Sequence, residues 1–271
     1  MDVHPMQPLS NWLYAWWHEW RSPHHRPKQG TIFHPLVETQ GLSNPVFCNM
    51  TYKALIPVKS LHSVKSRLAP HLTLHQRKNL VLDMLYHVIH VLHASNVIEE
   101  ILVVSPDQQV LAQAKAWGGQ ALLEEIPGHN AALHAVALKE RQTGTPALLT
   151  ISADLPLLHA YDISALIERS VHHAVGLAAS RDGTGTNATL TRPPLVLPYL
   201  FGPNSLYNYQ QAARQLYLPY TTYHSIGLAL DIDTIDDLED LYELQILSGE
   251  HMQSWLNHDH NEVPAHTPCP Y

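Results

Sequence analysis

The chain has 271 residues, of which 45% are hydrophobic, and it carries a formal net charge of −8 at pH 7. This length and apolar content allow one sizeable core, and the acidic balance leaves no basic footprint for a nucleic-acid partner. The two cysteines, Cys48 and Cys269, indicate neither a disulfide framework nor a thiolate metal site. No apolar run approaches the roughly 20 residues of a membrane span, and no signal-peptide pattern opens the chain. We therefore expect a cytoplasmic protein without membrane contact.

Composition divides the chain into three parts. Residues 1–49 hold four tryptophans among His, Pro and Gln with little periodicity, which predicts a poorly ordered N-terminal extension. Either translation begins at Met50, or the segment Asn11–Trp20 forms a short helix that contacts a membrane or a partner. Residues 50–248 carry the patterned domain, and the polar tail over residues 249–271 is predicted to be disordered.

Within the patterned domain, apolar strands alternate with amphipathic helices. In chain order, the spacing predicts a strand at 51–58, a helix at 72–94, a strand at 98–105, a helix at 110–117, a strand at 121–123, a helix at 130–141, a strand at 147–151, a helix at 161–172, a strand at 174–180 and a helix that starts near residue 207. Strands separated by helices indicate βαβ units, so we predict an α/β fold with a mostly parallel sheet and helices on both faces.

The strand at 147–151 runs into Asp154, and Pro156 prevents it from continuing. In an open α/β sheet, ligands bind at the carboxyl ends of the strands. Asp154 is therefore a candidate ligand for a divalent cation, and a simple turn acid is the alternative.

A second acidic cluster lies far downstream. Asp231 and Asp233 alternate with apolar residues, so on a strand both carboxylates would face one side, and Thr234 would begin a helix. Two carboxylates that face the same way repel each other unless a cation lies between them. With Asp154 as a third oxygen ligand, the cluster predicts a Mg²⁺ site; a solvated turn is the alternative.

Basic residues follow the first strand. Lys59, Lys65 and Arg67 would meet phosphates at the carboxyl edge of the sheet, where Arg67 could bind two oxygens in a fork. The alternative is a solvated charged loop. The loop lacks the glycines of a Walker or Rossmann phosphate motif, which disfavours those two types of site.

Three turns carry small and polar residues. Gly128 allows an unusual backbone conformation, and Asn130 is expected to cap the following helix, in preference to contacting a purine or ribose. Two further turns, Gly183–Asn187 and Gly202–Ser205, offer N–H and hydroxyl donors suited to a carboxylate or phosphate, or are plain turns.

Taken in order, these motifs resemble the CofC/FbiD guanylyltransferase family, which makes an early intermediate of the deazaflavin coenzyme F-420. The resemblance covers about residues 51–244 and rests on Ile56-Pro57-Val58-Lys59, Lys65-Ser66-Arg67-Leu68-Ala69, Asn130-Ala131-Ala132-Leu133, Ala153-Asp154-Leu155-Pro156, Gly183-Thr184-Gly185-Thr186-Asn187, Phe201-Gly202, Ser205 and the run Asp231–Leu238. It implies a single guanylyltransferase domain over residues 50–248. The implied fold is that of the nucleotidyltransferases of glycosyltransferase-A type, with a mixed sheet.

The resemblance also implies a reaction and its residues. GMP would pass from GTP to a phosphorylated three-carbon acid, which is phosphoenolpyruvate, 2-phospho-L-lactate or 3-phosphoglycerate, and pyrophosphate would leave. Mg²⁺ would be held by Asp154, Asp231 and Asp233, the triphosphate by Lys59, Lys65 and Arg67, the acid by Thr186, Gly202 and Ser205, and the nucleoside by Gly128 and Asn130. His129 departs from the usual Leu and Ile235 from the usual Pro. A homodimer is left open.

Two alternatives accompany this hypothesis. A molybdenum-cofactor guanylyltransferase would share the fold, but such enzymes open with a Gly-rich loop that this chain lacks. A catalytically silent nucleotide-binding regulator would be expected to have lost one of the three aspartates, and all three are present.

Overall fold

The computed structural model describes residues 51–248. The chain divides into a compact unit over Val46–Leu241 and a second unit made of Met1–Pro45 and Tyr242–Tyr271. Only residues 242–248 of the second unit are described, and they end the last helix. The predicted extension over residues 1–49 and the predicted tail over residues 249–271 lie outside the described residues and stay predictions, as does the domain boundary at residue 50.

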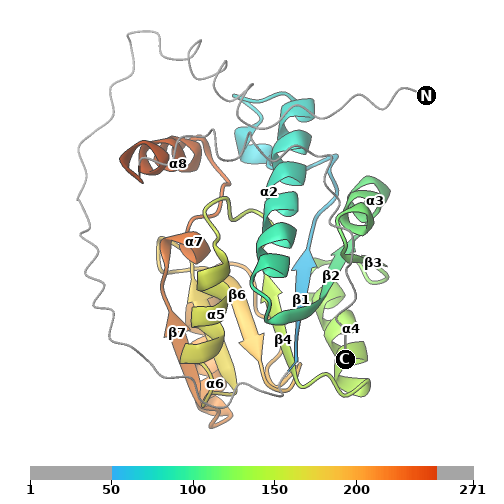
Figure 1. Ribbon diagram of the computed structural model, residues 1–271, viewed down its shortest axis with the longest axis vertical. Helices are drawn as coiled ribbons and strands as arrows, with labels where there is room; N and C mark the ends of the chain where they lie inside the picture. Colours follow the sequence, from blue (N-terminus) through green and yellow to red (C-terminus); the bar gives the residue numbers. More distant parts are fainter. Residues whose placement is uncertain (1–50, 249–271) are drawn as a thin grey trace, which may run out of the picture. The chain divides into compact units, whose positions relative to one another are not determined.

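The compact unit is built on a seven-stranded sheet in the order β3-β2-β1-β4-β6-β5-β7 (Figure 1). The strands are β1 (Tyr52–Pro57), β2 (Ile98–Ser105), β3 (Gln120–Leu123), β4 (Ala147–Ile151), β5 (Val175–Ala179), β6 (Thr186–Thr191) and β7 (Tyr220–Tyr223). β6 runs antiparallel to both of its neighbours, β4 and β5, and the other pairs are parallel. The predicted α/β class with a mixed, mostly parallel sheet is confirmed.

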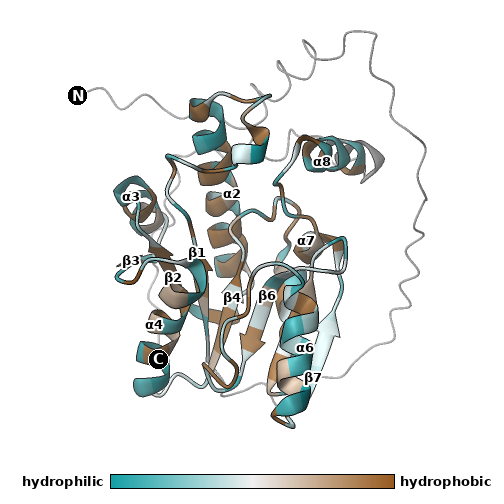
Figure 2. Cartoon of the chain, turned by 180° about the vertical axis from the view of Figure 1, so that it is seen from behind, coloured by the Kyte–Doolittle hydropathy of each residue, from teal (hydrophilic) through white to brown (hydrophobic). Residues whose placement is uncertain are grey.

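Helices cover both faces of this sheet. The helices are α2 (Leu74–Ala94), α3 (Gln108–Ala116), α4 (His129–Gln142), α5 (Ala160–Arg169), α6 (Ser205–Gln215), α7 (Ile226–Ala229) and α8 (Ile235–Ser248), with a 3₁₀ turn at Ser66–Leu68. Helices α2 and α5 lie on the face seen in Figure 1, and α4 and α6 lie on the face seen in Figure 2. Within residues 51–248, no helix is long and apolar enough to cross a membrane.

The core explains why the central strands are apolar throughout. Leu55 and Leu148 of the sheet pack against Leu133 of α4, while the β5 side of the sheet packs against Tyr209 of α6. Phe201, which lies between β6 and α6, contacts both of these clusters. Because each central strand is buried on both faces, its sequence is a continuous apolar run rather than an alternating one.

Two expectations about local structure are wrong. Asp231 and Asp233 do not lie on a strand. They lie in the irregular segment that connects the short helix α7 to α8. Thr186, expected in a loop, begins β6. β6 is fully buried despite its threonines, because it lies between β4 and β5.

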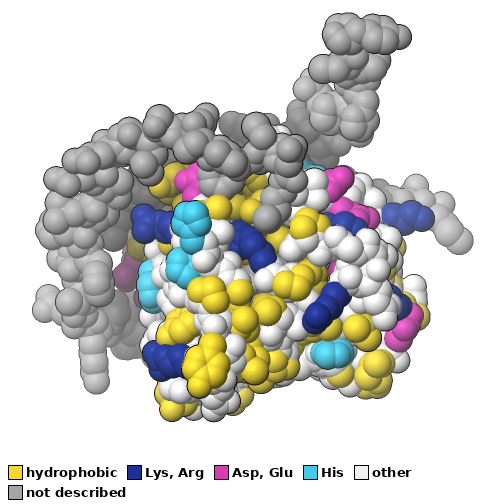
Figure 3. All heavy atoms as spheres, turned by 90° about the horizontal axis from the view of Figure 1, so that it is seen from below, with side chains coloured by type: hydrophobic (Ala, Val, Ile, Leu, Met, Phe, Trp, Pro, Cys, Tyr) yellow, Lys and Arg dark blue, Asp and Glu magenta, His cyan; other side chains and the backbone are white. Residues whose placement is uncertain are grey.

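Strand direction gathers the connecting segments at one edge of the sheet. The carboxyl ends of the six mutually parallel strands point to this edge, and the amino end of the antiparallel β6 does too. The opposite end, seen in Figure 3, shows hydrophobic side chains intermixed with Lys, Arg, His and acidic side chains. The polar motifs of the sequence therefore meet at the carboxyl edge.

Candidate active site

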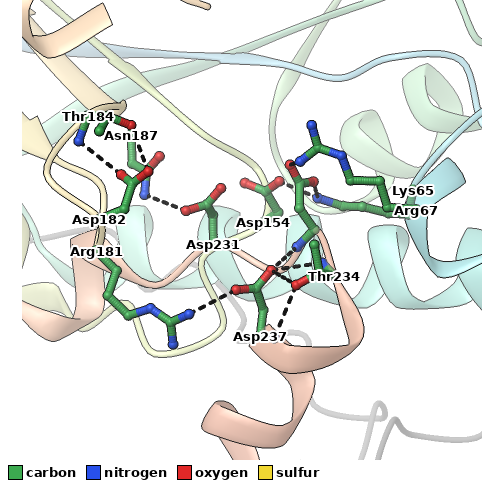
Figure 4. A network of polar contacts seen from close by, with 11 residues as sticks. Lys65, Arg67, Asp154, Arg181, Asp182, Thr184, Asn187, Asp231, Thr234 and Asp237 are labelled. Carbon is green, nitrogen blue, oxygen red and sulfur yellow. Dashed lines mark hydrogen bonds and ion pairs between the residues drawn. The ribbon is translucent and has the colours of Figure 1, made fainter. Parts of the chain in front are cut away.

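The centre of the site joins one lysine to two aspartates from distant parts of the chain (Figure 4). Lys65 Nζ bonds the carboxylate of Asp154, which follows β4, and lies 2.8 Å from Asp233 Oδ1. The two acidic segments are also tied by their backbones, because Ile232 N–H donates to the Asp154 carbonyl at 3.2 Å. We call Lys65, Asp154 and Asp233 the charged centre.

The charges of this centre stabilise one another. Burial disfavours the charge of Lys65, but attraction by Asp154 and Asp233 outweighs it, so the pKa of Lys65 is raised. Burial likewise works against the charge of Asp233, yet Lys65 keeps the pKa of Asp233 below its ordinary value. Lys65 and Asp233 are therefore charged at neutral pH.

Asp231 lies beside the charged centre but forms no ion pair with any of the described residues. Burial, reinforced by the charges of Asp154 and Asp233, raises the pKa of Asp231 to about 6. Its hydrogen-bond donor is neutral: Asn187 Nδ2 donates to Asp231 Oδ1 at 3.1 Å. A cation near Asp231 would relieve this repulsion.

The other two predicted cations are more exposed than Lys65. Only 7% of the Lys65 side chain is exposed, against 72% for Arg67, whose Nη1 lies 3.7 Å from Asp233 Oδ2. Lys59 is exposed, and its charge contributes to lowering the pKa values of Asp233 and His129. All three cations thus act on the same carboxylate, that of Asp233, and each helps to lower its pKa.

Lys65 has an unusual backbone that a second basic residue supports. Its φ of 48° and ψ of 49° lie in the left-handed region, which is strained for a residue with a side chain. Arg77 of α2 donates from Nη1 to the carbonyl of Val64 at 2.8 Å and to that of Lys65 at 3.4 Å. The sequence gives no signal for this role of Arg77, because it bonds backbone carbonyls, which carry no sequence motif.

The carboxylates fit a magnesium ion that also binds phosphate. Among residues 51–248, no three His, Cys, Asp or Glu side chains form a ready-made cage for a metal. Mg²⁺ is usually held by one or two carboxylates together with substrate phosphates and water, so it needs no complete cage. The oxygen donors of Asp154, Asp231 and Asp233, and the repulsion that acts on Asp231, match that requirement.

Asn187 is a site residue that the sequence placed only in a polar loop. A register shift between β5 and β6 leaves Asn187 out of the strand pairing, and such a bulge re-aims a side chain. Its Nδ2 lies 3.1 Å from the carbonyls of Leu228 and Ala229 as well as from Asp231 Oδ1. Asn187 therefore fixes the segment that leads into Asp231.

The three residues predicted for the acid lie in or beside two connected turns. Gly202 has a φ of 134°, which favours glycine. A Cβ built at this position would meet no other atom within 4 Å, so the space next to the Gly202 Cα is open. Ser205, which begins α6, is buried, and the buried Thr186 hydroxyl has no hydrogen-bond partner in the described structure. Leu206 N–H donates to the Thr184 carbonyl at 3.1 Å and joins the two turns.

The predicted helix cap at Asn130 is wrong. Helix α4 begins at His129, its cap residue is Gly128 with a φ of 112°, and no side chain of the cap residue bonds the N–H groups of the first turn. Asn130 lies inside the helix, and its amide bonds the backbone of Phe201 instead. Gly128 is exposed and has open space around its Cα, as a ligand contact would require.

The start of α8 anchors the turn that carries Asp233. Asp237 Oδ2 accepts the N–H of Asp233 at 3.0 Å and that of Thr234 at 2.8 Å, which caps the helix. Arg181, from the loop after β5, pairs with Asp237 at 3.2 Å and with Asp240. Ionic contacts thus join the loop after β5 to the turn of the charged centre.

Comparison with known proteins decides the family. A family model described as "Guanylyl transferase CofC like" matches residues 52–261. The chain belongs to this family. The family resemblance inferred from the order of motifs is therefore confirmed, and the guanylyltransferase assignment displaces both alternatives.

Individual members of the CofC-like family match most of the chain. The phosphoenolpyruvate guanylyltransferase of Sphaerobacter thermophilus is 39% identical over 192 residues, which cover 71% of this chain and 93% of the relative. That of Rubrobacter xylanophilus is 37% identical over 190 residues, 70% of this chain and 92% of the relative. The 2-phospho-L-lactate guanylyltransferase of Methanocaldococcus jannaschii is 29% identical over 196 residues, which cover 72% of this chain and 84% of the relative.

Solved structures agree on the fold. A cytidylyltransferase from Leptospira borgpetersenii superposes with a TM-score of 0.52 at 14% identity, covering 80% of this chain and all of that one. Glucosyl-3-phosphoglycerate synthase from Mycobacterium tuberculosis superposes with a TM-score of 0.51 at 12% identity, covering 81% of this chain and 88% of that one. The predicted nucleotidyltransferase fold of glycosyltransferase-A type is confirmed.

Proposed function

We propose that the protein transfers GMP from GTP to phosphoenolpyruvate or 2-phospho-L-lactate, as a cytoplasmic step of coenzyme F-420 biosynthesis. The phosphate oxygen of the acid would attack the α-phosphorus of GTP. One P–O bond would form there, and the bond to the β-phosphate oxygen would break and release pyrophosphate. The names of the relatives and the family assignment support this reaction.

The charged centre is the observation that carries the proposal. The acceptor already bears an anionic nucleophile, so the protein needs no activated Ser, Cys or His. Its task is to align two anions and to neutralise the charge on the phosphates. Lys65, Asp154 and Asp233 place one cation and two metal-type ligands within direct contact at the carboxyl edge of the sheet.

We propose that Asp154, Asp231 and Asp233 hold Mg²⁺, which would neutralise phosphate charge when bound. Lys65 then has two successive partners. Without a nucleotide its ammonium neutralises Asp154 and Asp233. Once an anionic triphosphate is present, the flexible ammonium stem can turn its donors to phosphate oxygens and leave both carboxylates to the metal. Arg67 and Lys59, both exposed, would contact the outer phosphates.

We assign the acid to the turns around Gly202 and Ser205 and to the Thr186 hydroxyl. A buried hydroxyl without a partner costs stability unless a ligand or water satisfies it, so Thr186 is suited to donate to a carboxylate. The open space above Gly202 leaves room for the three-carbon body of the acid. Gly128 would lie against the nucleoside.

The test supplies the protein with GTP, Mg²⁺ and each of three acids: phosphoenolpyruvate, 2-phospho-L-lactate and 3-phosphoglycerate. We expect pyrophosphate release and a GMP adduct of matching mass with one of the first two. ATP in place of GTP, and omission of the acid, are the controls. Absence of pyrophosphate release with both phosphoenolpyruvate and 2-phospho-L-lactate would overturn the proposal. A competition at equal acid concentrations ranks the acceptors.

A further inference from the structure

We infer that Asn130 is a positioning residue for the acceptor acid and not a contact for the nucleotide. Its Nδ2 donates to the Phe201 carbonyl at 2.9 Å, and the Phe201 N–H donates to its Oδ1 at 3.2 Å. Both polar atoms of the amide are therefore engaged by one residue's backbone that lies 71 residues away. Two such bonds fix the orientation of that backbone as well as its distance from α4.

The position of Phe201 in turn determines where the turn that we assign to the acid, Gly202–Ser205, lies. Gly202 follows it directly, and Ser205 N–H donates to the Gly202 carbonyl at 3.2 Å. The next N–H, that of Leu206, donates to Thr184 at 3.1 Å. A continuous chain of short contacts thus runs from Asn130 through the Gly202 turn to the loop that precedes Thr186.

The ring of Phe201 is held from the same helix start. His129 packs against it edge to face, with ring centres 5.5 Å apart at 85°. The rings of Tyr199 and Tyr209 also contact Phe201, with ring centres 6.0 and 5.6 Å away. The two Asn130 bonds therefore add a directional polar link to a set of aromatic contacts, which makes them suited to set the register of the turn.

The inference rests on the proposed reaction and separates two roles by their kinetic signatures. We expect Asn130→Ala to raise the KM for the acid by up to about a hundredfold, because misplacement of a group that positions the substrate has effects of this order. The KM for GTP and the binding of a non-hydrolysable GTP analogue should stay within about twofold of wild type. Asn130→Asp keeps the acceptor for Phe201 N–H but sets a carboxylate against the Phe201 carbonyl, so it should show the same selective defect.

Wild-type transfer is measured first, so that failure of the proposed reaction is seen separately from failure of this inference. Asn79→Ala on α2 is the matched control, since the Asn79 amide bonds the exposed ring of His75 and lies outside the site. Weaker GTP binding with an unchanged KM for the acid would show a nucleotide contact and overturn the inference. Equal losses for both substrates, or none, would overturn it as well. Because aspartate is nearly isosteric with asparagine, Asn130→Asp tests the point if the alanine variant does not fold.

Discussion

The two sides of the site are held together by different kinds of contact. In the charged centre, a single ammonium bridges Asp154 and Asp233. On the acceptor side, neutral amides hold backbone groups: Asn130 bonds Phe201, and Asn187, which follows Thr186, bonds the carbonyls of Leu228 and Ala229. One side depends on charge and the other on hydrogen bonds without net charge.

The difference indicates which side changes partners when ligands bind. An ammonium between two carboxylates can be replaced by another cation at little electrostatic loss. A buried neutral hydrogen bond has no such substitute, and leaving one of its partners unsatisfied costs about 1–3 kcal/mol. We therefore expect the charged centre to rearrange during the reaction, while the acceptor side stays as it is in the free protein.

The largest expected effect comes from Asp154→Asn. The change keeps the shape of the side chain but removes the charge that pairs with Lys65 and that we assign to the metal. We expect kcat/KM to fall about a hundredfold or more, which is the usual scale for loss of one electrostatic contact to a transition state. Steady-state pyrophosphate release measures it.

Asp236→Asn is the matched control for that change. Asp236 is an exposed acid in the first turn of α8, near Asp233 in sequence but outside the proposed ligand set. Its variant should keep wild-type activity. Full activity in Asp154→Asn would contradict the metal assignment even if the enzyme is a guanylyltransferase.

Lys65→Met separates the two partners of the lysine. Without the ammonium, Asp154 and Asp233 repel each other, so the nucleotide-free protein should bind Mn²⁺ severalfold more tightly than wild type. Transfer should nevertheless fall about a hundredfold, because the triphosphate loses a cation. Electron paramagnetic resonance of free Mn²⁺ in a titration without GTP measures the first effect. Lys115→Met, an exposed residue of α3, is the control. Unchanged Mn²⁺ binding in Lys65→Met would show that Lys65 does not compete with the metal.

Asn187→Ala tests the acceptor side. The variant leaves the buried Leu228 carbonyl and Asp231 Oδ1 without this donor, while the Ala229 carbonyl keeps its bond from the Arg181 N–H. We expect unfolding to become easier by about 1–3 kcal/mol and transfer to fall about tenfold. Asn208→Ala also removes an amide bond to a carbonyl, that of Pro203, but an exposed one. Urea unfolding should show a change well below that of Asn187→Ala, and equal losses would refute the distinction between buried and exposed amides.

The sequence predicted most of the sheet because its central strands are apolar on both faces. It missed β6 for the opposite reason: Thr186–Thr191 consists mostly of Thr and Asn, and only its place between β4 and β5 makes it buried. The turn at Asp231 and Asp233 was assigned to a strand from a period-two pattern. In the structure, Asn187 and the cap of α8 hold that turn without any strand pairing.

The site was predicted in its position but not in its contacts. The rule that ligands bind at the carboxyl edge brought Lys65, Asp154 and Asp233 together from three segments. This rule did not predict that Lys65 would bond carboxylates in the free protein, because a lysine at this edge is equally suited to bind phosphate. The bond of Asn130 to Phe201 joins residues far apart in sequence. A local signal at Asn130 could only favour a helix cap.

Asp83 is a buried acidic residue that belongs neither to the charged centre nor to the acceptor side of the site. It lies on α2, and its buried Oδ2 has no hydrogen-bond partner within the described residues. Burial raises the pKa of Asp83 from its ordinary value of 3.8 to about 7. The folded protein therefore binds a proton between about pH 4 and pH 7 that the unfolded chain releases, and the free energy of unfolding should fall as pH rises through this window.

Asp83→Asn should remove this slope and stabilise the protein above pH 7, while changing transfer little. His87, one helical turn away, acts in the opposite direction: burial lowers the pKa of His87 to about 4, so its contribution is lost as pH falls below 6.5. Wild type and variant share the His87 contribution, which cancels in the difference between their urea unfolding curves from about pH 4 to pH 8. A pH-independent difference would mean that Asp83 ionises normally, so that an acid can be buried on α2 without the partners that the site provides.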